Sequence, residues 1–150
     1  MRLTLIDLFA IIFCMEILVI DGQGGGLGKT IVAALRAHFP EAEINAVGTN
    51  SIATQQMLKA GADHGATGEN PVVVLSRSAD IIVGPIGICI ADSMYGEVTP
   101  KMAEAVGSSR AKRILIPVNI CGNFVVGVQD TSISAMIDGV IKAAEAVCKV

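Results

Sequence analysis

The residues best suited to chemistry in this sequence are glycines that follow an apolar run near the N-terminus. Ile17–Ile20 is apolar without a gap, Asp21 follows it, and five of the seven residues in Gly22–Gly28 are glycine. Because glycine has no side chain, the backbone N–H groups of such a loop can approach an anion closely. A helix that starts directly after the loop points the positive end of its dipole to the same place. The pattern predicts a loop that binds the phosphate of a nucleotide.

The spacing of the glycines resembles the loop of the short-chain dehydrogenases/reductases. Their pattern G-x-x-x-G-x-G fits at Gly22, Gly26 and Gly28, whereas the general dinucleotide pattern G-x-G-x-x-G would place its third glycine at Leu27. The catalytic Tyr-x-x-x-Lys of that family is missing, because the only tyrosine, Tyr95, has no lysine four positions later. The chain is also shorter than that family's full fold. The resemblance implies dinucleotide binding, with NAD(P) favoured over ATP, and leaves the reaction open.

A P-loop is the alternative interpretation of the same residues. Gly28-Lys29-Thr30 matches the end of the pattern G-x-x-x-x-G-K-[ST], but Gln23 stands where its first glycine is expected. A variant P-loop found in partitioning-type ATPases matches Gly25–Thr30, with Gly24 in place of its signature lysine. An acid after a later apolar strand would hold Mg²⁺, yet Asp80 precedes its strand. An ATP-binding phosphoryl-transfer protein therefore stays an alternative, and so does a binding or regulatory module without chemistry.

Apolar runs and amphipathic segments alternate along the chain and predict the elements that position this loop. Runs that indicate strands are 17–20, 43–47, 80–83, 113–118 and 124–128, with a very short one near 65–67. Residues 72–75 are strand-like through β-branching, although a helix is also compatible there. Apolar residues at helical spacing indicate helices at 27–39, 51–60, 101–106 and 133–147. The order predicts an α/β, doubly wound, Rossmann-like three-layer sandwich with a mostly parallel sheet.

Ligands of such sheets bind beyond the carboxyl ends of the strands, where the strand order reverses. The predicted strand ends are 21–28, 48–50, 84–87 and 119–122. At the second of them, a hydroxyl of Thr49 suits a phosphate, and Asn50 suits a ribose hydroxyl or simply the start of the next helix. This strand end therefore does not distinguish NAD, NADP and ATP. The predicted cofactor-binding residues are Gly22, Gln23, Gly24, Gly25, Gly26, Leu27, Gly28, Thr49, Asn50, Gly84 and Pro85.

The candidates for a catalytic group lie in the predicted loops. They are His64, Glu69 and Tyr95 in first place, and then Asp92, Ser93, Glu97 and Cys121. Asp63 directly precedes His64, so the pair suits an oriented general base. Isolated residues of these types are also common as solvated residues of surface loops. The sequence does not decide between a catalytic and a purely surface role.

Composition narrows the function classes. The 150 residues suit one domain, and a net charge of −3 with one Tyr, four Phe and no Trp offers no nucleic-acid surface. The four cysteines form no C-x-x-C pair and the two histidines have no metal-ligand spacing, so we expect no metal. Scattered cysteines fit reduced thiols in the cytoplasm. We expect a phosphate-bearing small molecule as the partner, no nucleic acid, and a monomer or a homo-oligomer.

The first fourteen residues are expected to be an N-terminal extension of undefined structure, with a single Rossmann-like domain over 15–150. Residues 3–14 are apolar apart from Thr4 and Asp7, but a membrane span needs about twenty apolar residues, and Asp7 and Glu16 interrupt the run. Only one basic residue, Arg2, precedes it, and no small-x-small cleavage site follows. We expect no membrane attachment, and Met15 to be the working start.

From residue 15 on, the chain resembles an uncharacterised bacterial family, a domain of unknown function with a DGQGGG signature. The resembling stretches are 20–26, 48–50, 60–62, 65–70, 84–87 and 114–117. The resemblance covers nearly all of 15–150 and implies a cytosolic bacterial protein with a Rossmann-like fold. It supplies no activity.

Overall fold

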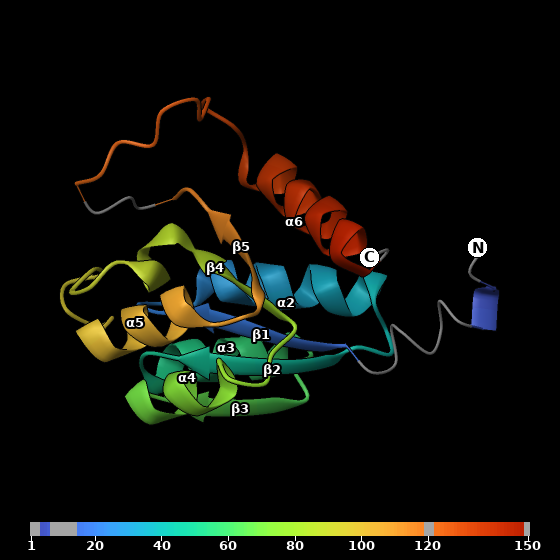
Figure 1. The fold of residues 1–150 in the computed structure, drawn as a ribbon, viewed down its shortest axis with the longest axis horizontal. Coiled ribbons are helices and arrows are strands. Elements are labelled where there is room, and N and C mark those ends of the chain that lie inside the picture. Colours follow the sequence, from blue (N-terminus) through green and yellow to red (C-terminus); the bar gives the residue numbers. More distant parts are fainter. Residues whose placement is uncertain (1–3, 7–14, 119–121, 149–150) are drawn as a thin grey trace.

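The structure is a computed structural model that describes residues 4–6, 15–118 and 122–148. In these residues one sheet of five parallel strands runs in the order β3-β2-β1-β4-β5 (Figure 1). The strands are β1 (Glu16–Asp21), β2 (Glu43–Gly48), β3 (His64–Thr67), β4 (Ile81–Pro85) and β5 (Lys112–Ile116). The order reverses between β1 and β4, so the predicted α/β, Rossmann-like architecture is confirmed. The sheet is parallel throughout.

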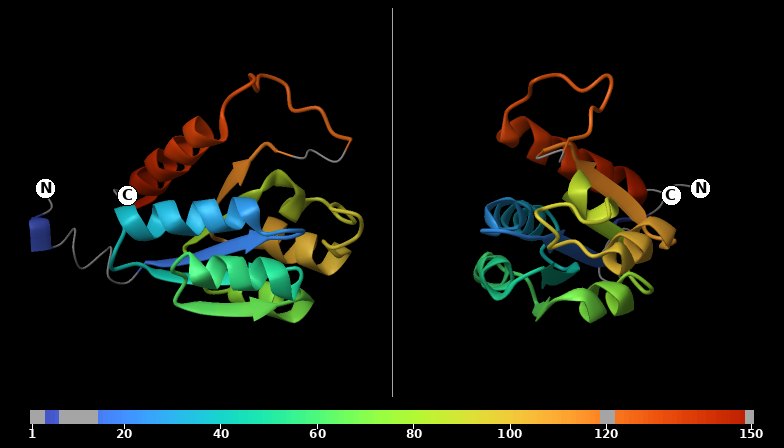
Figure 2. Two further views of the ribbon diagram at one scale, coloured as in Figure 1. Left: turned by 180° about the vertical axis from the view of Figure 1, so that it is seen from behind. Right: turned by 90° about the vertical axis from the view of Figure 1, so that its left-hand side faces the viewer.

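Helices cover both faces of the sheet (Figure 2). One face carries α2 (Gly26–His38), α3 (Ser51–Lys59) and α6 (Ile133–Cys148), and the other carries α4 (Glu69–Leu75), the short 3₁₀ helix η1 (Ile86–Cys89) and α5 (Pro100–Ser108). In β1, Ile17 and Val19 pack on the first face while Leu18 and Ile20 pack on the second. Burial on both sides explains why this strand is an unbroken apolar run rather than an alternating one.

Three helix ends follow from local residue chemistry. The Asn50 side chain accepts the Ala53 amide at the start of α3, and Thr99 accepts the Met102 amide at the start of α5, followed by Pro100. Helix α2 ends at His38, just before Pro40. These caps fix where the loops at the strand ends begin.

The strand-like interpretation of residues 72–75 is wrong, because these residues belong to α4. Gly68 has a φ of +100° and turns the chain out of β3, and Pro71 in the first turn of the helix has no N–H to lose. Only Val72 of the β-branched run is fully buried, while Val74 is 45% exposed. One buried residue per turn suits a short surface helix, so packing overrides the weak strand preference of valine.

The predicted strand at 124–128 is also wrong, since these residues form turns and coil. Phe124 and Val126 are both 98% exposed, and Gly127 has a φ of +86°. The apolar side chains therefore have no sheet neighbour to pack on, and strand preference depends on such neighbours. The segment 122–132 instead arches away from the sheet before α6 (Figure 1). No helix in the described residues is both long and apolar enough to cross a membrane.

Candidate functional site

The glycine loop lies at the carboxyl end of β1, beside the point where the strand order reverses. It surrounds a small hollow of about 120 Å³, which is lined by residues 21–27 together with Pro85 and Met94. Pro85 ends β4, the strand on the far side of the reversal, so the hollow sits between the two halves of the fold. This is the position at which open α/β sheets bind ligands.

Asp21 holds the loop in its conformation. Its side chain is buried, and its two carboxylate oxygens accept the Gly22 amide at 2.8 Å and the Gly28 amide at 2.6 Å. The N-cap of α2 is Gly25, which has no side chain, so Asp21 supplies the carboxylate that a helix N-terminus favours. Burial raises the pKa of Asp21 above its ordinary value of 3.8, against the opposing effect of the two amides.

The loop uses some of its backbone N–H groups internally and leaves others unused. Besides the two that Asp21 accepts, the Gln23 amide donates to Glu97 Oε2 at 2.7 Å and the Gly25 amide donates to the Gly22 carbonyl at 3.0 Å. Within the described part of the chain, the amides of Gly24, Gly26 and Leu27 make no hydrogen bond. These three donors border the hollow at the positive end of α2 and are available to a ligand.

The glycines of the loop fall into two groups according to what surrounds them. A Cβ on Gly25 would lie 2.6 Å from Ala53 Cα, and a Cβ on Gly28 would lie 2.7 Å from both Asp21 Cβ and Met57 Sδ, so the fold itself requires these glycines. Gly24 and Gly26 have no atom within 4 Å of such a Cβ, and neither has a positive φ. The fold does not need glycine at these two positions, whose own amides are two of the three unused ones.

Glu97 closes one side of the loop. Besides the Gln23 amide, its carboxylate accepts Asn50 Nδ2 at 2.9 Å, and Asn50 Nδ2 also donates to the Gln23 carbonyl at 2.9 Å. Asn50 is therefore fully engaged as a helix cap and as a bridge between β2 and the loop. Thr49 Oγ1 is buried and has no hydrogen-bond partner among the described residues, and a Cβ on Gly22 would lie 2.6 Å from it. Of these residues, only Gln23 and Gly22 line the hollow.

Strained backbone gathers around the hollow. In the described residues, the non-glycine positions with positive φ are Gln23 at 50°, Asp92 at 62°, Met94 at 55° and Tyr95 at 57°. Gln23 and Met94 line the hollow, and the other two belong to the same turn as Met94. Left-handed residues other than glycine cost free energy and concentrate at functional sites. The turn 92–95 is thus held in an unfavourable conformation over the loop.

The comparisons with known proteins identify a family. The sequence profile of the domain of unknown function DUF3842 matches residues 16–149. The chain belongs to this family. No curated protein matches the chain. The DUF3842 match begins at the first residue of β1 and covers the whole described sheet, including the glycine loop and the turn above it.

In this DUF3842 chain, most of the predicted catalytic candidates lie away from the hollow. His64 begins β3 and lies 3.8 Å from Glu43 at the amino end of β2, which is the opposite edge of the sheet. Asp63 pairs with Arg36 at 2.5 Å instead of orienting His64. Glu69 accepts the Thr99 hydroxyl at 2.6 Å. The structure therefore does not assemble Asp63 and His64 with the glycine loop.

The remaining predicted site residues lie in different parts of the structure. Tyr95 is fully exposed on the turn 92–95, and Ser93 Oγ donates to the Gly87 carbonyl at 2.5 Å. Asp92 is exposed, and Cys121 lies outside the described residues. Gly84 does not line the hollow, because it is packed against β1, where a Cβ would lie 2.4 Å from the Ile20 carbonyl oxygen. No cluster of three or more His, Cys, Asp or Glu side chains able to hold a metal occurs within the described ranges.

Lys29 and Thr30 do not face the hollow. Both are exposed, neither lines the hollow, and the Thr30 hydroxyl donates back to the Gly26 carbonyl at 2.9 Å. A P-loop needs this lysine and this hydroxyl on the phosphates and Mg²⁺. Both side chains lie on the exposed surface of α2 instead.

Proposed function

We propose that the glycine loop binds the phosphate groups of a nucleotide, with the pyrophosphate of NAD(P) as the favoured ligand. The observation that carries the proposal is the set of unused amides of Gly24, Gly26 and Leu27 around a hollow at the start of α2. Gly24 and Gly26 leave these amides uncovered although the fold has room for a side chain at both positions. A helix N-terminus with free N–H groups favours an anion.

The size of the hollow supports a phosphate group rather than a whole cofactor inside it. Sites that enclose a small molecule usually measure about 300–1,000 Å³, whereas this hollow measures about 120 Å³. In the proposed complex the pyrophosphate fills the hollow, and the rest of the ligand extends over the ends of the neighbouring strands. In a doubly wound sheet, a dinucleotide lies across the strand ends in this way.

Charge favours a dinucleotide over ATP. Asp21 and Glu97 place two carboxyl groups beside the loop, and Lys29 does not reach the hollow to balance them. The pyrophosphate of a dinucleotide carries about two negative charges and free ATP carries about four, so ATP without Mg²⁺ meets the greater repulsion. ATP bound with Mg²⁺ in a phosphoryl-transfer protein is the second candidate function, supported by the sequence Gly28-Lys29-Thr30 alone.

An NAD(P)-dependent oxidoreductase is the enzymatic form of this proposal, and a binding or regulatory module is its form without chemistry. Of the catalytic candidates, Glu97 contacts the loop through the Gln23 amide, and Asp92, Ser93 and Tyr95 belong to the turn 92–95 over it. The scattered cysteines support a cytoplasmic location, and the family resemblance supports a bacterial source.

A thermal-shift panel with NAD(H), NADP(H), and ATP with and without Mg²⁺ tests the proposal. A ligand at a hundred times its Kd adds about 2.7 kcal/mol, which raises the Tm of a domain of this size by roughly 5–10 °C. Gly26→Val should abolish the shift, because the new side chain covers the unused amides. Gly139→Val is the matched control: Gly139 is also an exposed helical glycine with nothing within 4 Å, but it lies in α6.

Each outcome of the panel favours one function. A shift with NAD(P) that needs no Mg²⁺ and is lost in Gly26→Val supports the dinucleotide site, and hydride transfer would then separate the enzyme from the module. A shift with ATP that needs Mg²⁺ supports the phosphoryl-transfer alternative. If no ligand shifts the Tm, or if Gly26→Val keeps the full shift while Gly139→Val behaves identically, the loop is not the site.

A further inference from the structure

A second cavity lies between α4 and α5, on the face of the sheet opposite α2. The cavity there measures about 460 Å³, which is within the size range of small-molecule sites. It shares no residue with the hollow of the glycine loop. Its lining comes from α4, from α5 and from the residues that follow each helix: Val73, Ser76, Arg77, Lys101, Glu104, Ala105, Ser108, Ser109 and Arg110.

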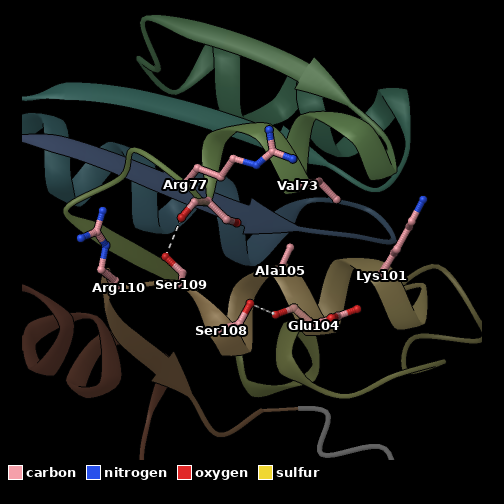
Figure 3. Close-up of a pocket in the computed structure, with 9 residues that line it drawn as sticks. Val73, Arg77, Lys101, Glu104, Ala105, Ser108, Ser109 and Arg110 are labelled. Carbon is pink, nitrogen blue, oxygen red and sulfur yellow. Dashed lines mark hydrogen bonds between the residues drawn. The ribbon is translucent and has the colours of Figure 1, made fainter.

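The cavity concentrates positive charge in a protein that is acidic overall. Arg77, Lys101 and Arg110 line it against a single acid, Glu104, whereas the chain as a whole has a net charge of −3. None of the three cations forms an ion pair with any residue that the structure describes. Figure 3 shows Arg77 on the α4 side, Lys101 near one end of the α5 side and Arg110 near the other. Such an arrangement attracts an anion with more than one charged group.

Ser76 supplies an independent observation. Ser76 lines the same cavity and is only 2% exposed, and its Oγ is itself buried and has no hydrogen-bond partner within the described part of the chain. Its backbone is satisfied, because its amide donates to the Val72 carbonyl at 3.0 Å and its carbonyl accepts the Ser109 hydroxyl at 2.5 Å. A buried hydroxyl without a partner costs free energy, and a ligand oxygen in the cavity would remove that cost.

We propose that this cavity binds a small organic anion that carries more than one phosphate or carboxylate group. The guanidinium groups of Arg77 and Arg110 suit either group, because each presents paired N–H donors to two oxygens. Lys101 adds a third positive charge, and Ser76 Oγ donates a hydrogen bond to one ligand oxygen. Val73 and Ala105 provide an apolar wall for the carbon part of the ligand.

The test is an NMR titration of the ¹⁵N-labelled full chain with pyrophosphate and with citrate, at constant ionic strength. The two probes separate phosphate from carboxylate ligands. We expect saturable shifts at the amides of the cavity residues with at least one probe. Arg77→Gln should weaken that binding about tenfold or more, since a hydrogen bond to a charged group is lost. Lys142→Gln, which removes an exposed cation of α6, is the matched control and should leave the affinity unchanged.

A second variant protects the test against a folding defect. Ser76→Ala removes a hydroxyl that makes no hydrogen bond, so it should fold like the parent chain and still bind the probe several-fold more weakly. Gly26→Val should not change binding in this cavity, which separates this site from the proposed nucleotide site. Absence of saturable shifts with both probes would overturn the proposal. So would equal affinities of Arg77→Gln and Lys142→Gln, or shifts centred on the glycine loop alone.

Discussion

Alanine at two adjacent positions of the glycine loop should have opposite effects. Gly25→Ala places a Cβ 2.6 Å from the Cα of Ala53, at a residue whose φ is +72°. Gly24→Ala places a Cβ where no atom lies within 4 Å, at a residue without a positive φ. Each variant adds one methyl group to the same loop. The two positions differ in backbone φ and in the atoms that surround the new Cβ.

The magnitudes follow from the two local structures. The left-handed conformation costs an L-residue roughly 1–2 kcal/mol, and overpacking against a backbone atom adds roughly 1–3 kcal/mol. Gly25→Ala should therefore lose about 2–5 kcal/mol of unfolding free energy. Gly24→Ala should be neutral or gain up to about 1 kcal/mol, because alanine restricts the unfolded chain. At roughly 2–4 °C per kcal/mol, Gly25→Ala should lower the Tm by about 4–20 °C.

Urea titrations followed by circular dichroism, with calorimetry for the Tm, measure both variants against the parent chain. The same two proteins should then be compared in the nucleotide panel, because Gly24→Ala keeps the fold but narrows access to the unused amides. Equal stability losses for the two variants would refute the assignment of Gly25 to folding and Gly24 to ligand access. A large loss in Gly24→Ala alone would refute it as well.

Three further substitutions test the network around the loop, and a fourth tests the Asp63–Arg36 ion pair at the opposite end of the sheet. Thr49→Val removes a buried hydroxyl without a partner, so the free energy of unfolding should stay constant or rise by about 1 kcal/mol in denaturant titrations. Asp21→Asn leaves one of two loop amides facing an NH₂ group and should cost about 1–3 kcal/mol in the same assay. Burial acts to raise the pKa of Asp63, but a backbone amide and the Arg36 guanidinium hold it below 3.8. The destabilisation caused by Asp63→Asn should thus be full at neutral pH and fade as pH falls through that lowered pKa; a constant difference across pH would contradict this. Glu97→Ala should tighten NAD(P) binding in calorimetric titrations, because it removes a competing carboxylate, and weaker binding would exclude that role.

The fold was predictable where one short stretch of sequence decides an element. The unbroken run of β1 needs burial on both faces, and Asn50, Thr99 and Pro100 mark helix starts by their own chemistry. Residues 72–75 and 124–128 carry similar β-branched or aromatic side chains, yet neither forms a strand. Strand formation depends on a neighbouring strand that the local sequence does not reveal. The errors therefore fall where tertiary packing decides.

The candidate site was predictable in the glycine loop, with Gln23 and Leu27, and in Pro85. The loop, the reversal of strand order and the approach of Pro85 follow from the βαβ pattern. The contact of Glu97 with the Gln23 amide joins residues 74 positions apart, and nothing in either local sequence announces it. The sequence contains one indication of the role of Asp21, which is an acid placed between a buried strand and a glycine. It does not show which amides the carboxylate accepts.

The internal use of the loop amides limits what the loop can bind. Asp21 and Glu97 already accept three of its N–H groups, so a ligand in the hollow meets only the amides of Gly24, Gly26 and Leu27. A ligand that extends toward the end of β2 must displace Glu97 and break two hydrogen bonds of a charged group, each worth about 1.5–3 kcal/mol. Such a ligand must offer an acceptor for the same two donors. A ribose hydroxyl or a phosphate oxygen would do so, which is why we propose an extended nucleotide for this loop in preference to an isolated anion of the same charge.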